Sequence, residues 1–271
     1  MKLRLLIGIA LAALLGGASS GAANFEFEKP TAANTGPDPE LRLRAYEGKN
    51  TITEKGAVIE GRHIRGTLNI KADDVTVRHC LIETKALYGI RAIYGAKNLL
   101  IENCELRGMA STAIYGGNFT ARSNYIHDQG ADGFKPSRNV VIQGNYLTRI
   151  GYKEKAHADG VQVSSGADVV IRGNNFDMPS GDKNFRNSIC IALLPDFGPI
   201  KNVEISNNWL NGGGWTIQSR DKKRGHGAPT GVKIIDNRFG RDYQFGAIVD
   251  DGDAIIEGNV WEDTGEPIPQ N

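Results

Sequence analysis

One eight-residue pattern recurs through the chain and constrains its fold more than any other feature. Each copy reads apolar, any residue, apolar, two polar or small residues, a corner residue, any residue, apolar. The copies are VTVRHCLI (75–82), LLIENCEL (99–106), FTARSNYI (119–126), VVIQGNYL (140–147), VVIRGNNF (169–176), VEISNNWL (203–210), VKIIDNRF (232–239) and AIIEGNVW (254–261). The corner residues are Cys80, Cys104, Asn124, Asn145, Asn174, Asn208, Asn237 and Asn259.

The spacing of the corner residues indicates a solenoid. Successive corners lie 24, 20, 21, 29, 34, 29 and 22 residues apart. Apolar residues that alternate with period two indicate strands, and a repeat of twenty-odd residues indicates a coil that stacks on itself. Asn suits a corner because it tolerates unusual backbone angles and its amide can bond the next Asn along the stack.

A second strand precedes most copies of the pattern and predicts a second parallel sheet. Its segments are YGIRAI (88–93), TAIYG (112–116), DGFKP (132–136), DGVQV (159–163), NSICIAL (187–193), WTIQS (215–219) and FGAIV (245–249). The expected inward row is Ile90, Ile114, Phe134, Val161, Ile189 and Ile217. The expected outward row is Arg91, Tyr115, Lys135, Gln162, Cys190 and Gln218.

Stacked parallel strands with an Asn corner resemble the right-handed parallel β-helix of the pectate-lyase-like superfamily, including its asparagine ladder. The resemblance covers roughly residues 51–263. The implied fold class is all-β, a right-handed parallel β-helix, and we assign it to residues 51–271. Lyases, hydrolases, epimerases and phage tailspikes share this architecture, so the resemblance implies a fold more than a function.

The first 50 residues form two segments ahead of the repeat. Residues 1–23 carry Lys2 and Arg4 before an uncharged apolar run from Leu5 to Leu15. This run is too short for a bilayer span and predicts a cleaved secretory signal, hence a secreted or periplasmic protein without a membrane span. Residues 24–50 are predicted to be a lead-in that covers the first end of the core.

Charge and inserted residues indicate the kind of partner. The formal charge of +1 gives no reason to expect a nucleic acid. Four insertions are expected to wall a groove over the second sheet. They are residues 151–158, 179–187, 194–200 and 219–231. Three loop segments carry eight Lys or Arg against three Asp or Glu, a surplus of +5. We therefore predict an acidic polysaccharide as partner, although such charge runs are often only solvated loop tips.

The densest cluster of chemically capable residues lies in this region. The sequence Asp-Gly-apolar-polar occurs at 132–135 and at 159–162, so Asp132 is expected to stack on Asp159 and Lys135 to lie beside Gln162. His127 and His157 are expected in or near the same groove. The alternative is structural, because Asp-Gly often marks the turn into a strand and an outward Lys or Gln needs no special role.

We expect β-elimination on a uronate polymer, which needs a base for the C5 proton and a group that neutralises the sugar carboxylate. The expected catalytic residues are Lys135, His157, Asp159 and Arg220. The expected substrate-binding residues are Asp132, Gln162, Arg186 and Trp215. The resemblance implies a Lys or Arg base, frequently with calcium, which Asp132 and Asp159 could hold as hard oxygen ligands on adjacent coils.

Other activities fit the same residues. Hydrolysis would use Asp132 and Asp159 as its two carboxyl groups, although the motifs of the polygalacturonases do not match and Gly225-His226-Gly227 looks coincidental. A uronate C5-epimerase would share the proton abstraction, and a binding or structural solenoid would need no catalysis. The sequence gives no oligomeric state.

The three cysteines leave one question open. Cys80 and Cys104 occupy neighbouring corners, so they either form a disulfide, which export permits, or remain two buried thiols. Cys190 has no expected partner.

Overall fold

The computed structural model describes residues 28–93, 95–153 and 156–269, and the predicted signal segment 1–23 lies outside them. The described residues form 28 short strands and no helix. They accordingly contain no helix long and apolar enough to cross a membrane.

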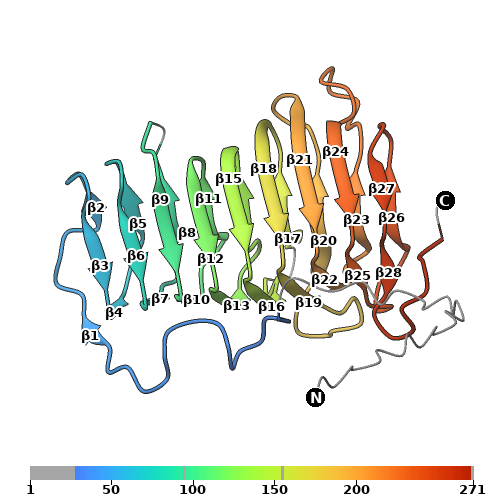
Figure 1. The fold of residues 1–271 in the computed structure, drawn as a ribbon. Helices are drawn as coiled ribbons and strands as arrows, with labels where there is room; N and C mark the ends of the chain where they lie inside the picture. Colours follow the sequence, from blue (N-terminus) through green and yellow to red (C-terminus); the bar gives the residue numbers. More distant parts are fainter. Residues whose placement is uncertain (1–27, 94, 154–155, 270–271) are drawn as a thin grey trace, which may run out of the picture.

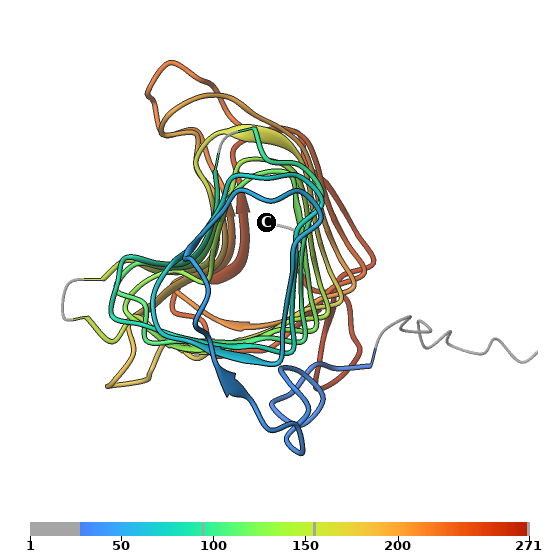
Figure 2. The same cartoon turned by 90° about the vertical axis from the view of Figure 1, so that its left-hand side faces the viewer.

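Each coil contributes one strand to each of three parallel sheets, which stack into a rod (Figures 1 and 2). Sheet A contains β1 (Arg44–Ala45), β4 (Arg62–Ile64), β7 (Leu81–Glu83), β10 (Glu105–Arg107), β13 (Tyr125–Gln129), β16 (Tyr146–Ile150), β19 (Asn175–Met178), β22 (Trp209–Gly212), β25 (Arg238–Phe239) and β28 (Val260–Trp261). Sheet B contains β2 (Thr51–Ile52), β5 (Leu68–Ile70), β8 (Tyr88–Ala92), β11 (Thr112–Gly116), β14 (Phe134–Pro136), β17 (Ala158–Val163), β20 (Asn187–Leu193), β23 (Trp215–Ser219) and β26 (Gly246–Asp250). Sheet C contains β3 (Val58–Glu60), β6 (Thr76–Arg78), β9 (Leu99–Glu102), β12 (Phe119–Arg122), β15 (Arg138–Gln143), β18 (Gly166–Arg172), β21 (Ile200–Ser206), β24 (Thr230–Ile235) and β27 (Ile255–Glu257).

The eight-residue pattern folds into two strands rather than one, so the structure has three sheets where the sequence predicted two. In the copy at 99–106, β9 lies in sheet C and β10 in sheet A. The chain bends between them at Asn103, whose φ of 49° lies in the left-handed region. In every copy the unusual angle falls on the residue before the corner residue. These residues are His79, Asn103, Ser123, Gly144, Gly173, Asn207, Asp236 and Gly258.

The predicted asparagine ladder is confirmed. Both the backbone amide and Nδ2 of Asn124 donate to Oδ1 of Asn145, at 3.0 and 2.9 Å. The same two contacts repeat at each step from Asn145 to Asn259. Nδ2 of Asn124 also donates to the carbonyl of Ile101 at 3.1 Å. Because these groups are buried, each bond satisfies a donor that would otherwise lose its water partner.

The cysteines are free thiols. Cys80 and Cys104 are fully buried at the start of the ladder. Sγ of Cys80 lies 3.5 Å from the carbonyl oxygen of Ile59, and Sγ of Cys104 lies 3.6 Å from that of Val77. The buried-thiol alternative is therefore confirmed, and no disulfide joins the two corners.

The inward row of sheet B is as predicted except on one strand. Val161 pairs with Ile191, which is fully buried, and the register shifts between Ala158 and Asp159. Cys190 is buried, which corrects its predicted outward position, and Ala192 pairs with Gln162 instead. The sequence NSICIAL has apolar residues at three alternating positions, so its hydrophobic pattern fits a register two residues away equally well.

The lead-in runs along the outside of sheet A, from late coils back to the first (Figure 1). Nδ2 of Asn175 donates to the carbonyl of Pro30 at 2.8 Å, and the amide of Gly36 donates to the carbonyl of Ser123 at 2.9 Å. Its end forms β1, which pairs with β4. Most of residues 28–43 therefore cover a flank of the rod, and only the last residues of the lead-in reach the first coil.

Candidate functional site

Loops stand on both sides of sheet B, as the insertions predicted (Figure 2). Residues 151–157 and 179–186 connect sheet A to sheet B, and residues 194–199 and 220–229 connect sheet B to sheet C. A groove of about 430 Å³ lies on the outer face of sheet B. Its lining includes Tyr88, Tyr115, Lys135, Arg138, Gln162 and Phe197.

Two carboxyl groups on adjacent coils contact side chains of this groove, although neither carboxyl group lines the groove itself. Asp132 precedes β14 and Asp159 lies in β17, and they are only 1% and 2% exposed. Nζ of Lys135 lies 2.7 Å from Oδ2 of Asp132. Nε2 of Gln162 donates to Oδ2 of Asp159 at 3.0 Å, and the backbone amide of Asp159 donates to Oδ1 of Asp132 at 2.9 Å. This matches the predicted stacking of the two Asp-Gly motifs.

Burial raises the pKa of both carboxyl groups, and their partners oppose the rise to different extents. Burial, reinforced by the charge of Asp132, raises the pKa of Asp159 to about 8. Burial also raises the pKa of Asp132, but the ammonium group of Lys135 opposes that rise. Burial therefore favours the protonated form of Asp159 near neutral pH, whereas at Asp132 the ammonium group of Lys135 works against the same effect.

One carboxyl oxygen of the pair has no partner among the described residues. Oδ1 of Asp159 is buried without a hydrogen bond, while the other three oxygens each face an N–H or ammonium donor. The described residues contain no group of three or more His, Cys, Asp or Glu side chains that could hold a metal. Calcium would have to displace Lys135 and Gln162, so this donor set does not suit it and no chemical step is assigned to it.

Two side chains of the flanking loops also act on the carboxyl pair. His157 is exposed just before β17, and its charge acts to lower the pKa of Asp132. Lys222, exposed in the loop 220–229, acts in the same direction on Asp159.

Three predicted site residues lie apart from the groove. Nε of Arg220 contacts Oδ2 of Asp251 at 3.2 Å. Arg186 is exposed in the loop 179–186. Trp215 packs against Phe245 with ring centroids 6.4 Å apart. The groove lies over earlier coils, which the positions of the longest insertions did not indicate.

Aromatic side chains line part of the groove. Tyr88 and Tyr115 occupy adjacent coils with ring centroids 5.0 Å apart. The guanidinium carbon of Arg91 lies 5.1 Å from the Tyr88 centroid and 5.9 Å from the Tyr115 centroid. The predicted outward row placed Arg91, Tyr115 and Lys135 in one line, but only the structure adds Tyr88 to them.

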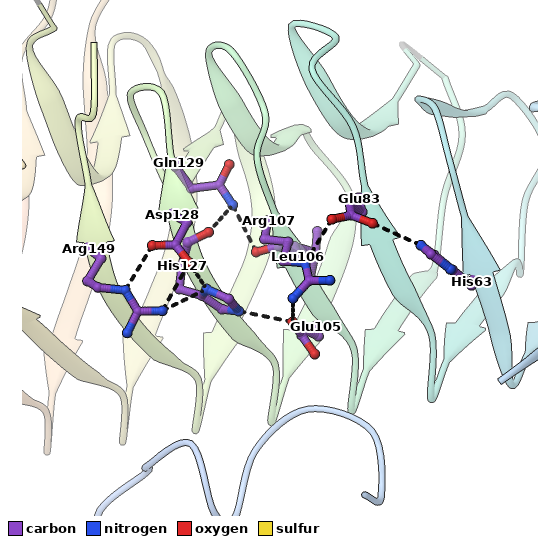
Figure 3. Close-up of polar contacts among 9 residues, drawn as sticks. All are labelled: His63, Glu83, Glu105, Leu106, Arg107, His127, Asp128, Gln129 and Arg149. Carbon is purple, nitrogen blue, oxygen red and sulfur yellow. Dashed lines mark hydrogen bonds and ion pairs between the residues drawn. The ribbon is translucent and has the colours of Figure 1, made fainter. Parts of the chain in front are cut away.

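His127 lies on sheet A, which corrects its expected place in the groove. Its strand, β13, is separated from β14 by the corner between the sheets. Nε2 of His127 lies 3.1 Å from Oε1 of Glu105, and Nδ1 lies 2.6 Å from Oδ2 of Asp128 (Figure 3). These two contacts of His127 belong to a polar network across sheet A. Its members are His63, Glu83, Arg107, Glu105, His127, Asp128 and Arg149.

The three sheets and the ladder agree with a family comparison. A family described as "Right handed beta helix region" matches residues 56–226, more than half of the 271 residues. The chain belongs to this family. This β-helix protein is also similar to "Uncharacterized protein YclG" of Bacillus subtilis (strain 168), with 24% identity over 119 residues. That match covers 44% of the chain and 19% of the relative, so the chain spans about a fifth of the length of the curated relative.

Solved structures similar to this β-helix protein include catalytic domains of GH87 alpha-1,3-glucanase. One, in complex with tetrasaccharides, is 15% identical with a TM-score of 0.47, and the match covers 78% of this chain and 56% of that one. Another, in complex with nigerose, is 14% identical with a TM-score of 0.45, and the match covers 77% of this chain and 50% of that one. The activity of this chain has to be argued from its own site.

Proposed function

We propose that this chain is a glycoside hydrolase whose polysaccharide substrate lies in the groove on sheet B. The observation that carries the proposal is the pair of adjacent buried carboxyl groups with unlike partners, Lys135 on Asp132 and Gln162 on Asp159. Glycoside hydrolysis needs an acid that protonates the leaving oxygen and a carboxylate that acts as base or nucleophile. Asp159 supplies the acid, and Asp132, paired with Lys135, supplies the carboxylate.

Two groove side chains link the substrate site to these groups. Lys135 and Gln162 line the groove, and each also contacts one of the two carboxyl groups. A sugar that reaches Asp159 displaces the amide of Gln162 and satisfies the unpaired Oδ1. Tyr115, 38% exposed, offers an aromatic face for the C–H surface of a neighbouring sugar.

β-Elimination on an acidic polysaccharide is the second candidate. The cations in and beside the groove favour it, because Lys135 and Arg138 line the groove and His157 lies close to Asp132. An ammonium group in an ion pair has no free lone pair, so Lys135 does not suit the role of base and His157 would take it. An exported location, secreted or periplasmic, belongs to either version of the proposal.

A panel of neutral and uronate-containing polysaccharides, with and without calcium, tests the proposal. The purified protein should release new reducing ends without the ultraviolet absorbance of an unsaturated uronate. Asp159→Asn and Asp132→Asn should each reduce the rate by about a hundredfold or more, whereas Asp253→Asn, at an exposed carboxyl, should not change it.

Other outcomes overturn the assignment. A rise in ultraviolet absorbance with the new ends would make elimination the reaction. Binding without new ends would indicate an epimerase or a non-catalytic solenoid, and a change in uronate configuration would separate these two.

A further inference from the structure

A second recess of about 950 Å³ lies at the corner between sheets A and B. It opens beside the ends of β7 and β10, and its lining shares no residue with the groove on sheet B. The lining side chains that carry charge or an aromatic ring are Arg65, Glu83, Lys85, Arg107, Tyr152 and Phe185, together with Asp128. We call it the corner recess.

The acidic side chains of the corner recess already have basic side chains of the protein as partners. Glu83 contacts His63 at 3.1 Å and Arg107 at 3.2 Å (Figure 3). Although burial acts to raise it, these two partners hold the pKa of Glu83 below its ordinary value.

Asp128 is held in the same way. Nε of Arg149 donates to its Oδ1 at 2.8 Å. The hydrogen bonds from Arg149, followed by those of His127, lower the pKa of Asp128 to about 2. The carboxylates of the recess therefore remain ionised and paired, and they leave little negative charge to repel an anion.

Two cations of the corner recess have no such partner. Arg65 and Lys85 are exposed, and neither forms an ion pair with a carboxylate of the described residues. The ammonium group of Lys85 instead lies over the ring of Tyr152, 5.3 Å from its centroid. The recess thus presents uncompensated positive charge next to an aromatic face.

The aromatic face is fixed in place. The hydroxyl of Tyr152 donates to the carbonyl of Gly108 at 3.0 Å, which ties the loop 151–157 to the end of β10. Tyr152 as a whole stays 37% exposed. Phe185, from the loop 179–186, lines the same recess. A ring anchored by its own hydroxyl loses little freedom when a ligand packs on it.

We propose that the corner recess is a second, non-catalytic site that binds an anionic sugar unit. The C–H face of the sugar packs on Tyr152, and its anionic group, a carboxylate or a sulfate, contacts Arg65 and Lys85. The site would hold a second stretch of an acidic polysaccharide while the groove on sheet B holds another. Because it requires binding and no bond cleavage, this inference stands apart from the proposed hydrolase activity.

Calorimetric titration of the full chain tests it. An Asp159→Asn background prevents turnover, and the probes are short oligogalacturonates, sulfated dextran oligosaccharides and neutral malto-oligosaccharides. Arg65→Ala combined with Lys85→Ala should weaken one class of sites for the anionic probes by about tenfold or more. Tyr152→Ala should weaken the same class. The two anionic probes show whether carboxylate or sulfate is preferred.

The matched control is Lys201→Ala combined with Lys233→Ala, two exposed cations on sheet C with the same change in net charge. This control should leave the affinity unchanged. Equal weakening by both double variants would show only long-range attraction and overturn the proposal, as would unchanged binding in the Arg65/Lys85 variant or equal binding of the neutral probe. If no polysaccharide is cleaved by the unaltered protein, the hydrolase proposal fails but these binding results still decide the corner recess.

Discussion

The backbone amide of Asp159 donates to Oδ1 of Asp132 at 2.9 Å. This bond joins two successive coils at the point where both carry a buried carboxyl group. It fixes one carboxyl above the other, and each is then held by the residue three positions later, Lys135 or Gln162. The regular stacking of the solenoid therefore brings the two acids together on neighbouring coils.

The raised pKa of Asp159 predicts a pH dependence of stability. Its pKa is about 8 in the folded chain and 3.8 as the ordinary value, so the folded state binds the proton more tightly. The stabilisation from this group is complete below the ordinary value and is lost as the pH rises through about 8. Between these limits the free energy of unfolding of Asp159→Asn should fall less with pH than that of the unaltered chain. Urea unfolding across this range measures the difference.

Asp253→Asn serves as the control for that comparison, because its carboxyl group is exposed. It should follow the unaltered chain at every pH. Identical pH dependence in Asp159→Asn and the unaltered chain would show that Asp159 ionises normally and would remove the acid from the proposed mechanism.

Lys135 should determine the pH at which kcat/KM falls on the acid side of its pH profile. The hydrolase needs Asp132 ionised, so activity falls as the pH drops through the pKa of Asp132. Lys135 acts to lower that pKa, so Lys135→Met should raise it and move the acid limb of kcat/KM to higher pH. Lys135→Arg should return the limb towards its original position because it restores the charge. If Lys135→Met lowers the rate without shifting the acid limb of kcat/KM, Lys135 acts in substrate binding alone.

The sequence was sufficient for features that depend on one coil stacking on the next. The ladder from Asn124 to Asn259 followed from a single repeated position. The proximity of Asp132 and Asp159 followed from the repeated Asp-Gly motif. In both cases parallel stacking places equal positions of successive repeats side by side.

The sequence was insufficient where the path of the chain between repeats decides the outcome. Alternating apolar residues in β20 fit two registers, so the pairing of Val161 with Ile191 rather than Ile189 could not be foreseen. The eight-residue pattern did not reveal the bend between sheets C and A. The residue that adopts the left-handed φ at this bend, such as Ser123, is not one of the repeated apolar positions. Nor could periodicity show that Arg220 would meet Asp251, since that contact depends on the shape of a long loop.

A break in the middle of the ladder should cost much of the stability. Asn174→Ala removes the acceptor of two donors of Asn145, both at 2.9 Å, and the donor to the carbonyl of Ile142. Leaving such buried groups unpaired should lower the free energy of unfolding by on the order of 3–5 kcal/mol. Asn184→Ala, at an exposed loop position, should cost less than about 0.5 kcal/mol. Equal losses in urea unfolding would contradict a structural role for the ladder.

Replacing the glycine that precedes a corner residue should destabilise the fold through its backbone φ angle alone. Gly144 has a φ of 63°, and a Cβ built on it would lie 3.9 Å from Oγ of Ser123. Space therefore permits Gly144→Ala, but the left-handed angle should make it destabilising by about 1 kcal/mol. Gly181 has no atom within 4 Å of such a Cβ and lacks a left-handed φ, so Gly181→Ala should be neutral or slightly stabilising. The two variants make the same chemical change, and thermal unfolding should separate them. If Gly144→Ala proves as stable as Gly181→Ala, the bend between sheets C and A does not depend on a left-handed residue.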